Sequence, residues 1–531
     1  MRKLALFLTY QRTTFSDAMR TASQLNKHGS YEPIFLISAQ RESSLDQEVA
    51  ECRKRGIACV YEEQLLARPW SALMTETTQS DVGGSPRSRV PRVRGVAGRM
   101  AARAEESLGL VLAVVLRLAG IRASASLWRT AIGRWHRRRV LRRLRRAERY
   151  GYLEYLLRAE LDIRKVLTRL QPEVVCLSED IPGMYSGPFI RAARRKGIPS
   201  IVIPFTIPNV LETAESCINI AVPWHAAPAY RAAAFAYPRW SMLHKGRTLL
   251  RSKPGLVHAS EIAGLAPPNP WIVNSGSSDR IAVESERMLE VYRAAGFPEA
   301  QLALTGSCGD DMLFAAAFDK TSRREVVYRQ LGLPAGKRLL LSALVPDQLV
   351  SGVPECEFDR YSELLEFWVK ALAAWNREFN VVLKINPRYR REEFTYLEKF
   401  GVAVAPHDTI ELVPLADIYV ASISSTLRWA AACGIPSINY DVYQYRYGDF
   451  VGAPGIVHVE TKEAFVHEVN RLAQDQAYWS ELLRAQAADA PRWALMDGKS
   501  THRLVELLDS LCGAASMRSR NRLPGHQREW P

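Results

Sequence analysis

Short apolar runs of strand length alternate with helix-length periodic stretches along most of the chain, and this alternation occurs in two successive series. Such a pattern is typical of parallel sheets covered by helices. In the first series the expected strands are 4–9, 33–37, 57–61, 173–177, 200–204 and 271–274. In the second series they are 338–344, 380–385, 402–405, 418–421, 436–440 and 455–459. We therefore predict an α/β chain of two tandem doubly wound, Rossmann-like parallel-sheet domains.

The 531 residues leave room for two or three domains. We expect a first domain over 1–310, interrupted by an insert at 83–150, and a second domain over 311–490. A terminal helix is expected over 491–514. The polar composition of 515–531 predicts a disordered tail.

The eight cysteines include no Cys-x-x-Cys pair, which fits a reducing cytoplasm. The apolar run Leu4 to Leu8 is too short for the core of a signal peptide. No window reaches the roughly 18 apolar residues of a spanning helix. We therefore expect a cytoplasmic protein without integral membrane segments.

The positive charge of the chain is concentrated in the insert at 83–150. This segment holds 18 Arg, no Lys and three acidic residues, an excess of 15 that equals the net charge of the whole chain. An apolar patch at 108–116, together with Trp128 and Trp135, favours a helix lying at an anionic bilayer surface. A solvated Arg-rich hairpin or loop is the alternative. Binding of nucleic acid is a further alternative for the insert. Because no recognisable binding motif accompanies the charge, we expect no nucleic-acid partner.

Two adjacent carboxylates, Glu179 and Asp180, directly follow the expected strand 173–177. Ligands of doubly wound sheets bind at the carboxyl ends of the strands, and a neighbouring charge raises the pKa of a carboxyl group. One of the two is therefore a candidate general base. The alternative is a pair of acids that stabilises the start of the next helix.

Other strand ends carry cations and hydroxyls that suit a phosphate or ribose. Lys384 and Arg388 flank a Pro-containing turn, where they could bind a phosphate leaving group. The run 422–426 places hydroxyls before a helix whose amides would attract an anion. Surface turns and simple helix capping are the alternatives. The candidate donor-binding residues are Gly306, Ser307, Lys384, Asn386, Arg388, His407, Thr409, Glu411, Ser422, Ser424, Ser425 and Thr426.

The sequence supports neither a resident metal nor a cofactor. It has no Gly-rich phosphate loop of the ATPase kind and no His cluster at zinc spacing. Glu355, Glu357 and Asp359 alternate before a helix, a pattern more typical of solvated first-turn acids than of a metal site.

Residues 150–475 resemble the GT-B class of bacterial surface-polysaccharide glycosyltransferases, related in fold to UDP-N-acetylglucosamine 2-epimerases and teichoic-acid polymerases. The resemblance rests on the order of four motifs. They are Glu179-Asp180, the 273–306 segment with Gly296-Phe297-Pro298, the Lys384 to Pro387 turn, and the Ser424-Ser425-Thr426 to Gly434-Ile435-Pro436 helix. Ser178-Glu179-Asp180 stands where the epimerases carry His-Gly-Asp, which favours the transferase.

The resemblance implies two domains facing a cleft and a metal-independent transfer of sugar from a UDP- or CMP-linked donor. The acceptor would be a saccharide, expected to be lipid-linked, in capsule, lipopolysaccharide or O-antigen biosynthesis. Glu179 or Asp180 would deprotonate the acceptor, while Lys384, Arg388 and the 424–426 amides would stabilise the leaving phosphate. We expect a peripheral protein at the inner face of the cytoplasmic membrane, bound to its anionic surface. A sugar-nucleotide 2-epimerase and a non-catalytic, membrane-recruited scaffold remain the alternatives.

Overall fold

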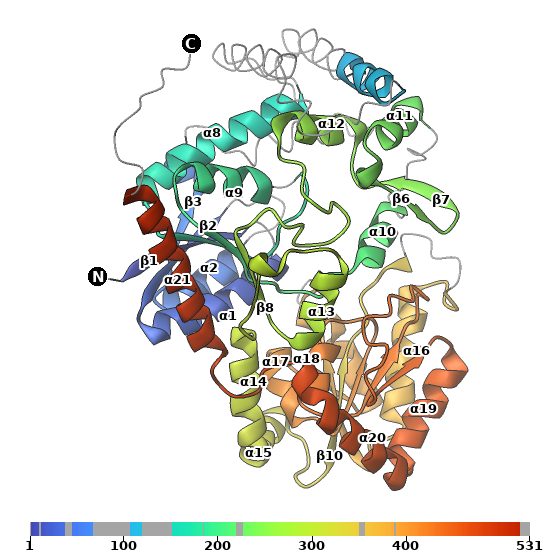
Figure 1. The fold of residues 1–531 in the computed structure, drawn as a ribbon. Helices are drawn as coiled ribbons and strands as arrows, with labels where there is room; N and C mark the ends of the chain where they lie inside the picture. Colours follow the sequence, from blue (N-terminus) through green and yellow to red (C-terminus); the bar gives the residue numbers. More distant parts are fainter. Residues whose placement is uncertain are drawn as a thin grey trace, which may run out of the picture. The chain divides into compact units, whose positions relative to one another are not determined.

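The computed structural model describes residues 2–9, 12–37, 45–66, 107–118, 151–183, 185–218, 227–349, 356–386 and 389–520 (Figure 1). The chain forms two compact units. Unit 1 comprises 1–205, 213–281 and 505–531, and unit 2 comprises 206–212 and 282–504. The expected junction at 310 falls inside α14 (Cys308–Phe318).

Among the described residues, the first sheet has seven strands in the order β3-β2-β1-β4-β5-β8-β9. The strands are β1 (Lys3–Thr9), β2 (Tyr31–Ile37), β3 (Ala58–Tyr61), β4 (Val174–Leu177), β5 (Ser200–Val202), β8 (Arg280–Val283) and β9 (Leu302–Leu304). The pairs from β3 to β8 are parallel, with Ala5 opposite Val174 in the central pair. The division between the units falls inside β8.

The helices of the first half follow the strands as crossover connections. They are α1 (Arg12–His28), α2 (Asp46–Lys54), α3 (Glu62–Leu65), α8 (Tyr152–Leu170), α9 (Ser186–Arg195), α10 (Val210–Ile218), α11 (Pro228–Ala236) and α12 (Pro254–Ala263). A further helix spans 107–118. The strands β6 (Ser241–His244) and β7 (Arg247–Leu250) form an antiparallel hairpin. Within α8, the apolar residues Leu156, Ala159, Ile163 and Val166 are buried at helical spacing, as expected for a stripe that packs toward the core.

In the part of unit 2 that the structure describes, six parallel strands follow the order β12-β11-β10-β13-β14-β15. They are β10 (Arg338–Ala343), β11 (Phe379–Lys384), β12 (Ala403–Val404), β13 (Ile418–Ala421), β14 (Ser437–Tyr440) and β15 (Ile456–Val459). The helices are α13 (Glu286–Ala294), α14, α15 (Lys320–Leu331), α16 (Tyr361–Ala373), α17 (Thr409–Leu412), α18 (Leu427–Ala432), α19 (Lys462–Gln474), α20 (Gln476–Asp489) and α21 (Ser500–Arg520), the last continuing into unit 1. Short 3-10 helices span Glu299–Gln301, Val413–Leu415 and Ala490–Arg492, and a longer one spans Arg391–Phe400. Unit 1 has one at Pro238–Trp240 among its described residues.

An aromatic stack fills the core of unit 2 between its sheet and two helices. The ring of Phe465 on α19 lies 4.6 Å from that of Tyr440 on β14 and 5.0 Å from that of Trp368 on α16. Trp368 Nε1 donates to Ser342 Oγ on β10 at 2.9 Å, so the buried indole N–H is satisfied. This packing joins α16 and α19 to β10 and β14.

The prediction of two doubly wound parallel sheets is confirmed, but two local expectations were wrong. Residues 271–274 are not a strand, and the strand of this region is β8. The apolar run there ends at Asn274, whose φ of 68° turns the chain into a loop. The tail expected to be disordered from 515 is helical as far as Arg520, because α21 continues beyond the predicted end.

Among the described residues, no helix is long and apolar enough to cross a membrane.

Candidate functional site

Two buried carboxyl groups follow β4 in unit 1. Glu179 is 5% exposed and Asp180 is 2% exposed. Burial, with a smaller contribution from the charge of Asp180, raises the pKa of Glu179 to about 7. A carboxyl group with this pKa is partly ionised at neutral pH and can both accept and release a proton, which suits a general base.

Asp180 forms several hydrogen bonds to the loop at 274–278 and fixes its path. Its Oδ2 accepts the Ser277 amide at 2.9 Å, and its carbonyl accepts both the amide and the hydroxyl of Ser275 at 3.0 Å. Asp180 N donates to Asn274 Oδ1 at 3.3 Å. Burial raises the pKa of Asp180, and the hydrogen bonds from Ser277 oppose that rise. The geometry therefore makes Glu179 the better base candidate and Asp180 a residue that positions the loop.

A tight turn connects this pair to α9. Gly183 has a φ of 80°, and a Cβ there would lie 2.6 Å from Leu256 Cδ2, so the turn needs glycine. Ser186 Oγ accepts the Ile181 amide at 3.1 Å. The positive φ of Gly183 and the hydrogen bond from Ile181 to Ser186 hold the chain immediately after Asp180 in one path.

The hydroxyl loop at 422–426 lies between β13 and α18 in unit 2, as predicted. Thr426 Oγ1 lies 2.7 Å from Ser424 Oγ and 2.5 Å from the hydroxyl of Tyr419. Ser422 is 3% exposed, and within the described part of the chain its Oγ has no hydrogen-bond partner. A buried hydroxyl without a partner is unusual, so it marks this loop as a candidate ligand site. Ser425 is half-buried in the same loop.

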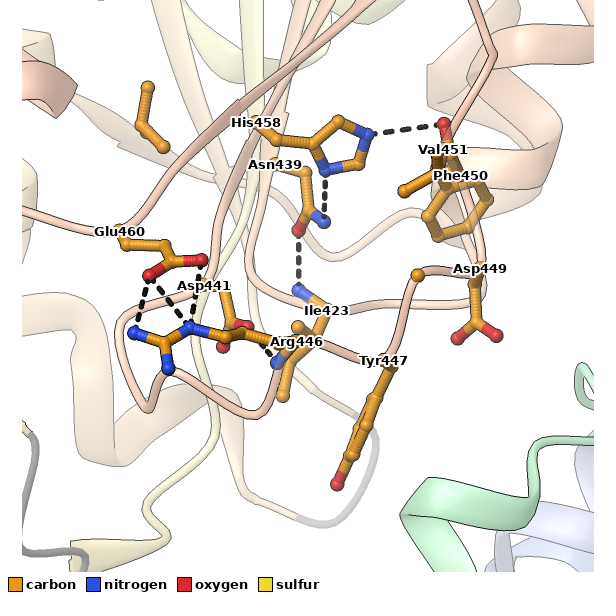
Figure 2. A pocket seen from close by; sticks show the side chains of 12 residues that line it. Ile423, Asn439, Asp441, Arg446, Tyr447, Asp449, Phe450, Val451, His458 and Glu460 are labelled. Atoms are coloured by element: carbon orange, nitrogen blue, oxygen red, sulfur yellow. Dashed lines mark hydrogen bonds and ion pairs between the residues drawn. The ribbon is translucent and has the colours of Figure 1, made fainter.

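The backbone at Ile423 is strained. Its φ is 41°, in the left-handed region that a β-branched residue rarely adopts. Its amide donates to Asn439 Oδ1 at 2.8 Å (Figure 2). Asn439 Nδ2 donates in turn to His458 Nδ1 at 3.1 Å, and His458 Nε2 donates to the Phe450 carbonyl at 3.1 Å. In this series Nε2 of His458 carries the proton donated to the carbonyl, and the series connects the hydroxyl loop to β14, β15 and the 441–453 segment.

A cavity of about 220 Å³ adjoins this network. Its lining residues are Ile423, Asn439, Asp441, Arg446, Tyr447, Gly448, Asp449, Phe450, Val451, His458, Val459 and Glu460. Figure 2 shows Tyr447 and Asp449 extending to the same side of the segment that carries them. A concave site with polar side chains and a perturbed carboxyl group is a reasonable candidate for ligand binding.

Among the described residues, Asp449 is one of three carboxyl groups that line this cavity, with Asp441 and Glu460, and the sequence did not indicate it as a site residue. Burial raises its pKa to about 7, and a hydrogen bond from Asn209 partly opposes the rise. Asn209 Nδ2 donates to Asp449 Oδ1 at 2.5 Å. One sequence feature could have pointed to Asp449. It is the stretch 443–449, in which three tyrosines and an acid follow a strand end.

Lys384 ends β11 and lies near the predicted 407–411 group. Burial lowers the pKa of Lys384, whereas the charges of Asp408 and Glu411 oppose that change. His407 Nε2 lies 2.6 Å from Gln330 Oε1, and burial lowers the pKa of its ring. Thr409 begins α17 and is buried. Asn386 is half-buried, and Arg388 lies outside the described residues.

The structure gives Gly306 and Ser307 local structural contacts. Ser307 Oγ accepts the Gly309 amide at 3.1 Å, and the Ser307 amide donates to Asp310 Oδ2 at 3.0 Å, forming a capping box for α14. Gly306 has a φ of 76°, and a Cβ there would clash with Ser500 Oγ. A donor contact by these two residues stays a prediction.

No group of three or more His, Cys, Asp or Glu side chains is placed to hold a metal ion in the described ranges.

Neither a protein-family model nor a curated protein sequence matches the chain. Similar solved structures include the UDP-GlcNAc 2-epimerase from Neisseria meningitidis bound to UDP-GlcNAc, at 12% identity and a TM-score of 0.49 over 96% of this chain and 100% of that one. The glycotransferase of kitacinnamycin is similar at 14% identity and a TM-score of 0.46, over 96% and 99% of the two chains. The wall teichoic acid polymerase TagF is similar at 11% identity and a TM-score of 0.47, over 96% and 89%.

Proposed function

We propose that this protein is a glycosyltransferase of the GT-B type that transfers a sugar from a UDP- or CMP-linked donor to a saccharide acceptor. The observation that carries the proposal is Glu179, a buried carboxyl group at a strand end with a pKa raised to about 7. In this proposal unit 1 binds the acceptor and supplies the base. Unit 2 binds the donor through the hydroxyl loop and the neighbouring strand ends.

In the proposed reaction, each proton and electron pair is accounted for by Glu179, the acceptor, the donor and water. The Glu179 carboxylate takes the proton of the acceptor hydroxyl as its oxygen bonds to the anomeric carbon of the donor sugar. The bond from that carbon to the phosphate oxygen breaks, and the nucleotide leaves with the electron pair. Lys384 and the hydroxyls of Ser424 and Thr426 would stabilise the charge on the leaving phosphate. Glu179 then releases its proton to water.

The acceptor that we propose is a lipid-linked saccharide of a surface polysaccharide, used at the inner face of the cytoplasmic membrane. The support is the charge distribution, because the 18 Arg of 83–150 would be attracted to anionic lipid by about 1 kcal/mol each near the surface. Comparing radiolabelled transfer to an organic-extractable lipid-linked acceptor with transfer to a free oligosaccharide tests this choice. Transfer to the free oligosaccharide alone would contradict it.

The first experiment offers the full chain a panel of UDP- and CMP-sugars and measures nucleotide release. Release that depends on Glu179 supports the proposal. Glu173→Gln is a matched control, since Glu173 lies before the opposite end of β4 and its Oε2 accepts the Leu4 amide, which a glutamine oxygen can also do. Release of no nucleotide from any donor would favour the scaffold alternative. Conversion of the sugar without acceptor, with the nucleotide still attached, would identify an epimerase.

A further inference from the structure

The helix at 107–118 carries an exposed apolar face. Its outward side chains are Leu108 at 69% exposure, Val111 at 59%, Val115 at 53% and Leu118 at 73%. At 3.6 residues per turn these four positions fall within an arc of about 80°. Single exposed apolar side chains are common on protein surfaces, but a continuous row along one helix is a mark of an interaction surface.

The opposite side of the same helix is anchored to unit 1. Leu110 and Ala113 are buried, at 7% and 0% exposure. Gly109 lies so close to α12 that a Cβ there would clash with His258 Nε2. His258 is itself buried and lies 2.6 Å from the Tyr237 hydroxyl through Nδ1. The helix, drawn in light blue in Figure 1, therefore has one side packed on unit 1 and its apolar side chains exposed on the other.

We propose that this face inserts into the headgroup region of an anionic bilayer. The charge of the surrounding sequence selects this occupant, because 83–150 carries 18 Arg against three acids, and the helix itself contains Arg117 and no acid. Apolar side chains enter the acyl boundary while nearby arginines bind anionic headgroups. A basic protein partner would be repelled by the same charge. The inference extends the proposed function, since it names the element that would bring the enzyme to a lipid-linked acceptor.

The test is cosedimentation of the full chain with phosphatidylcholine vesicles with and without phosphatidylglycerol, at low and high salt. The variant replaces Leu108, Val111, Val115 and Leu118 by Gln, which preserves helix propensity. We expect its partition coefficient on the anionic vesicles to fall at least about tenfold at both salt concentrations, because salt screens the arginine contribution and not the apolar one. Val111→Gln alone, at the centre of the face, is expected to give a smaller loss in the same direction.

The matched control replaces two exposed apolar residues of unit 2, Phe318 at 88% and Val326 at 45% exposure, by Gln. Its vesicle binding should equal that of the unchanged chain. Equal binding by the fourfold variant at both salt concentrations would overturn the proposal. The proposal would also be overturned if the unchanged chain did not bind vesicles, formed a dimer in solution, and became monomeric in the fourfold variant. A second copy of the chain would then cover the face. Nucleotide release from soluble donor should persist in the fourfold variant, and its absence from every form would count against the transferase rather than the membrane surface.

Discussion

Asn439 accepts the amide of Ile423 at 2.8 Å and so holds this isoleucine at a φ of 41°. A β-branched residue in the left-handed region is costly, by roughly 1–2 kcal/mol. His458 supports Asn439 from the neighbouring strand, at 3.1 Å between Nδ1 and Nδ2. Strain that surrounding contacts maintain is often found at ligand sites. We infer that the Asn439–His458 pair sets the path of the hydroxyl loop.

Replacing His458 by Ala should weaken donor-nucleotide binding, because Asn439 loses a partner and the loop relaxes from the strained conformation. The expected loss is about 5- to 30-fold, the equivalent of roughly 1–2 kcal/mol. Adding Ile423→Gly should restore most of the affinity, since glycine adopts a positive φ without this cost. Calorimetric titration with UDP and CMP measures both changes.

The control for this experiment is His467→Ala, which removes an exposed histidine of unit 2. It should leave nucleotide affinity unchanged. If His458→Ala binds normally, or if Ile423→Gly fails to restore the loss in a folded double variant, the pair has no positioning role.

The hydroxyl loop should itself contact the donor. Replacing Ser424 and Ser425 by Leu should reduce nucleotide affinity at least tenfold, because bulky side chains would fill the space next to Thr426 and remove two hydroxyls. The melting temperature should stay close to that of the unchanged chain, as both positions are only half-buried. A folded double variant with unchanged calorimetric affinity would place the donor elsewhere.

Glu179→Gln should lower turnover by about 100-fold or more, as expected for removal of a general base. In the unchanged chain the rate should rise with pH and reach half its plateau near pH 7, because only the ionised carboxylate accepts a proton. Asp180→Asn should shift the profile to lower pH, since the charge of Asp180 contributes to the raised pKa of Glu179. A pH–rate profile of the unchanged chain and both variants measures this. If both variants turn over at nearly the original rate, the base lies elsewhere.

The sequence predicts the strands well where the signal is local. The apolar runs at β1, β4, β10, β11 and β13 lie within a residue or two of their predicted bounds, because burial of a parallel strand on both faces leaves a continuous apolar segment. The run at 271–274 has the same local composition. It becomes a loop through hydrogen bonds to Asp180, more than ninety positions earlier in the chain, and no local pattern records such a contact.

The candidate site likewise contains residues that the sequence predicts and residues that it does not. The position of Glu179 after a strand, and of the hydroxyls after another, could be predicted because a strand end is a local feature. Asp449 could not, since its pKa depends on burial and on Asn209, which is 240 positions away in the sequence. The strain at Ile423 could not be predicted either, because it depends on the hydrogen bond from its amide to Asn439 on the next strand.

Glu179 should also destabilise the fold at high pH. Its pKa is about 7 in the folded chain against an ordinary value of 4.5, so between these two pH values the folded state keeps a proton that the unfolded state releases. The free energy of unfolding therefore falls as pH rises from about 4.5 to about 7 and changes no further above that. Glu179→Gln, which is neutral throughout, should be more stable than the unchanged chain at pH 8 by about 3 kcal/mol, and not at pH 4. Urea denaturation at the two pH values checks this, and an equal difference at both would contradict it.

Asp449 offers an independent check on the cavity of unit 2. The hydrogen bond from Asn209 favours its ionised form, so Asn209→Ala should raise the pKa of Asp449 above its present value of about 7. Carboxyl-carbon NMR titration of the chain labelled at aspartate would follow the group directly, with Asp449→Asn used to assign the resonance. A ligand that donates a hydrogen bond to this carboxylate should lower its pKa, whereas a phosphate placed beside it should raise it. Titration with donor sugar present and absent therefore tells which part of the donor approaches Asp449, and an unchanged pKa would show that the donor leaves this cavity empty.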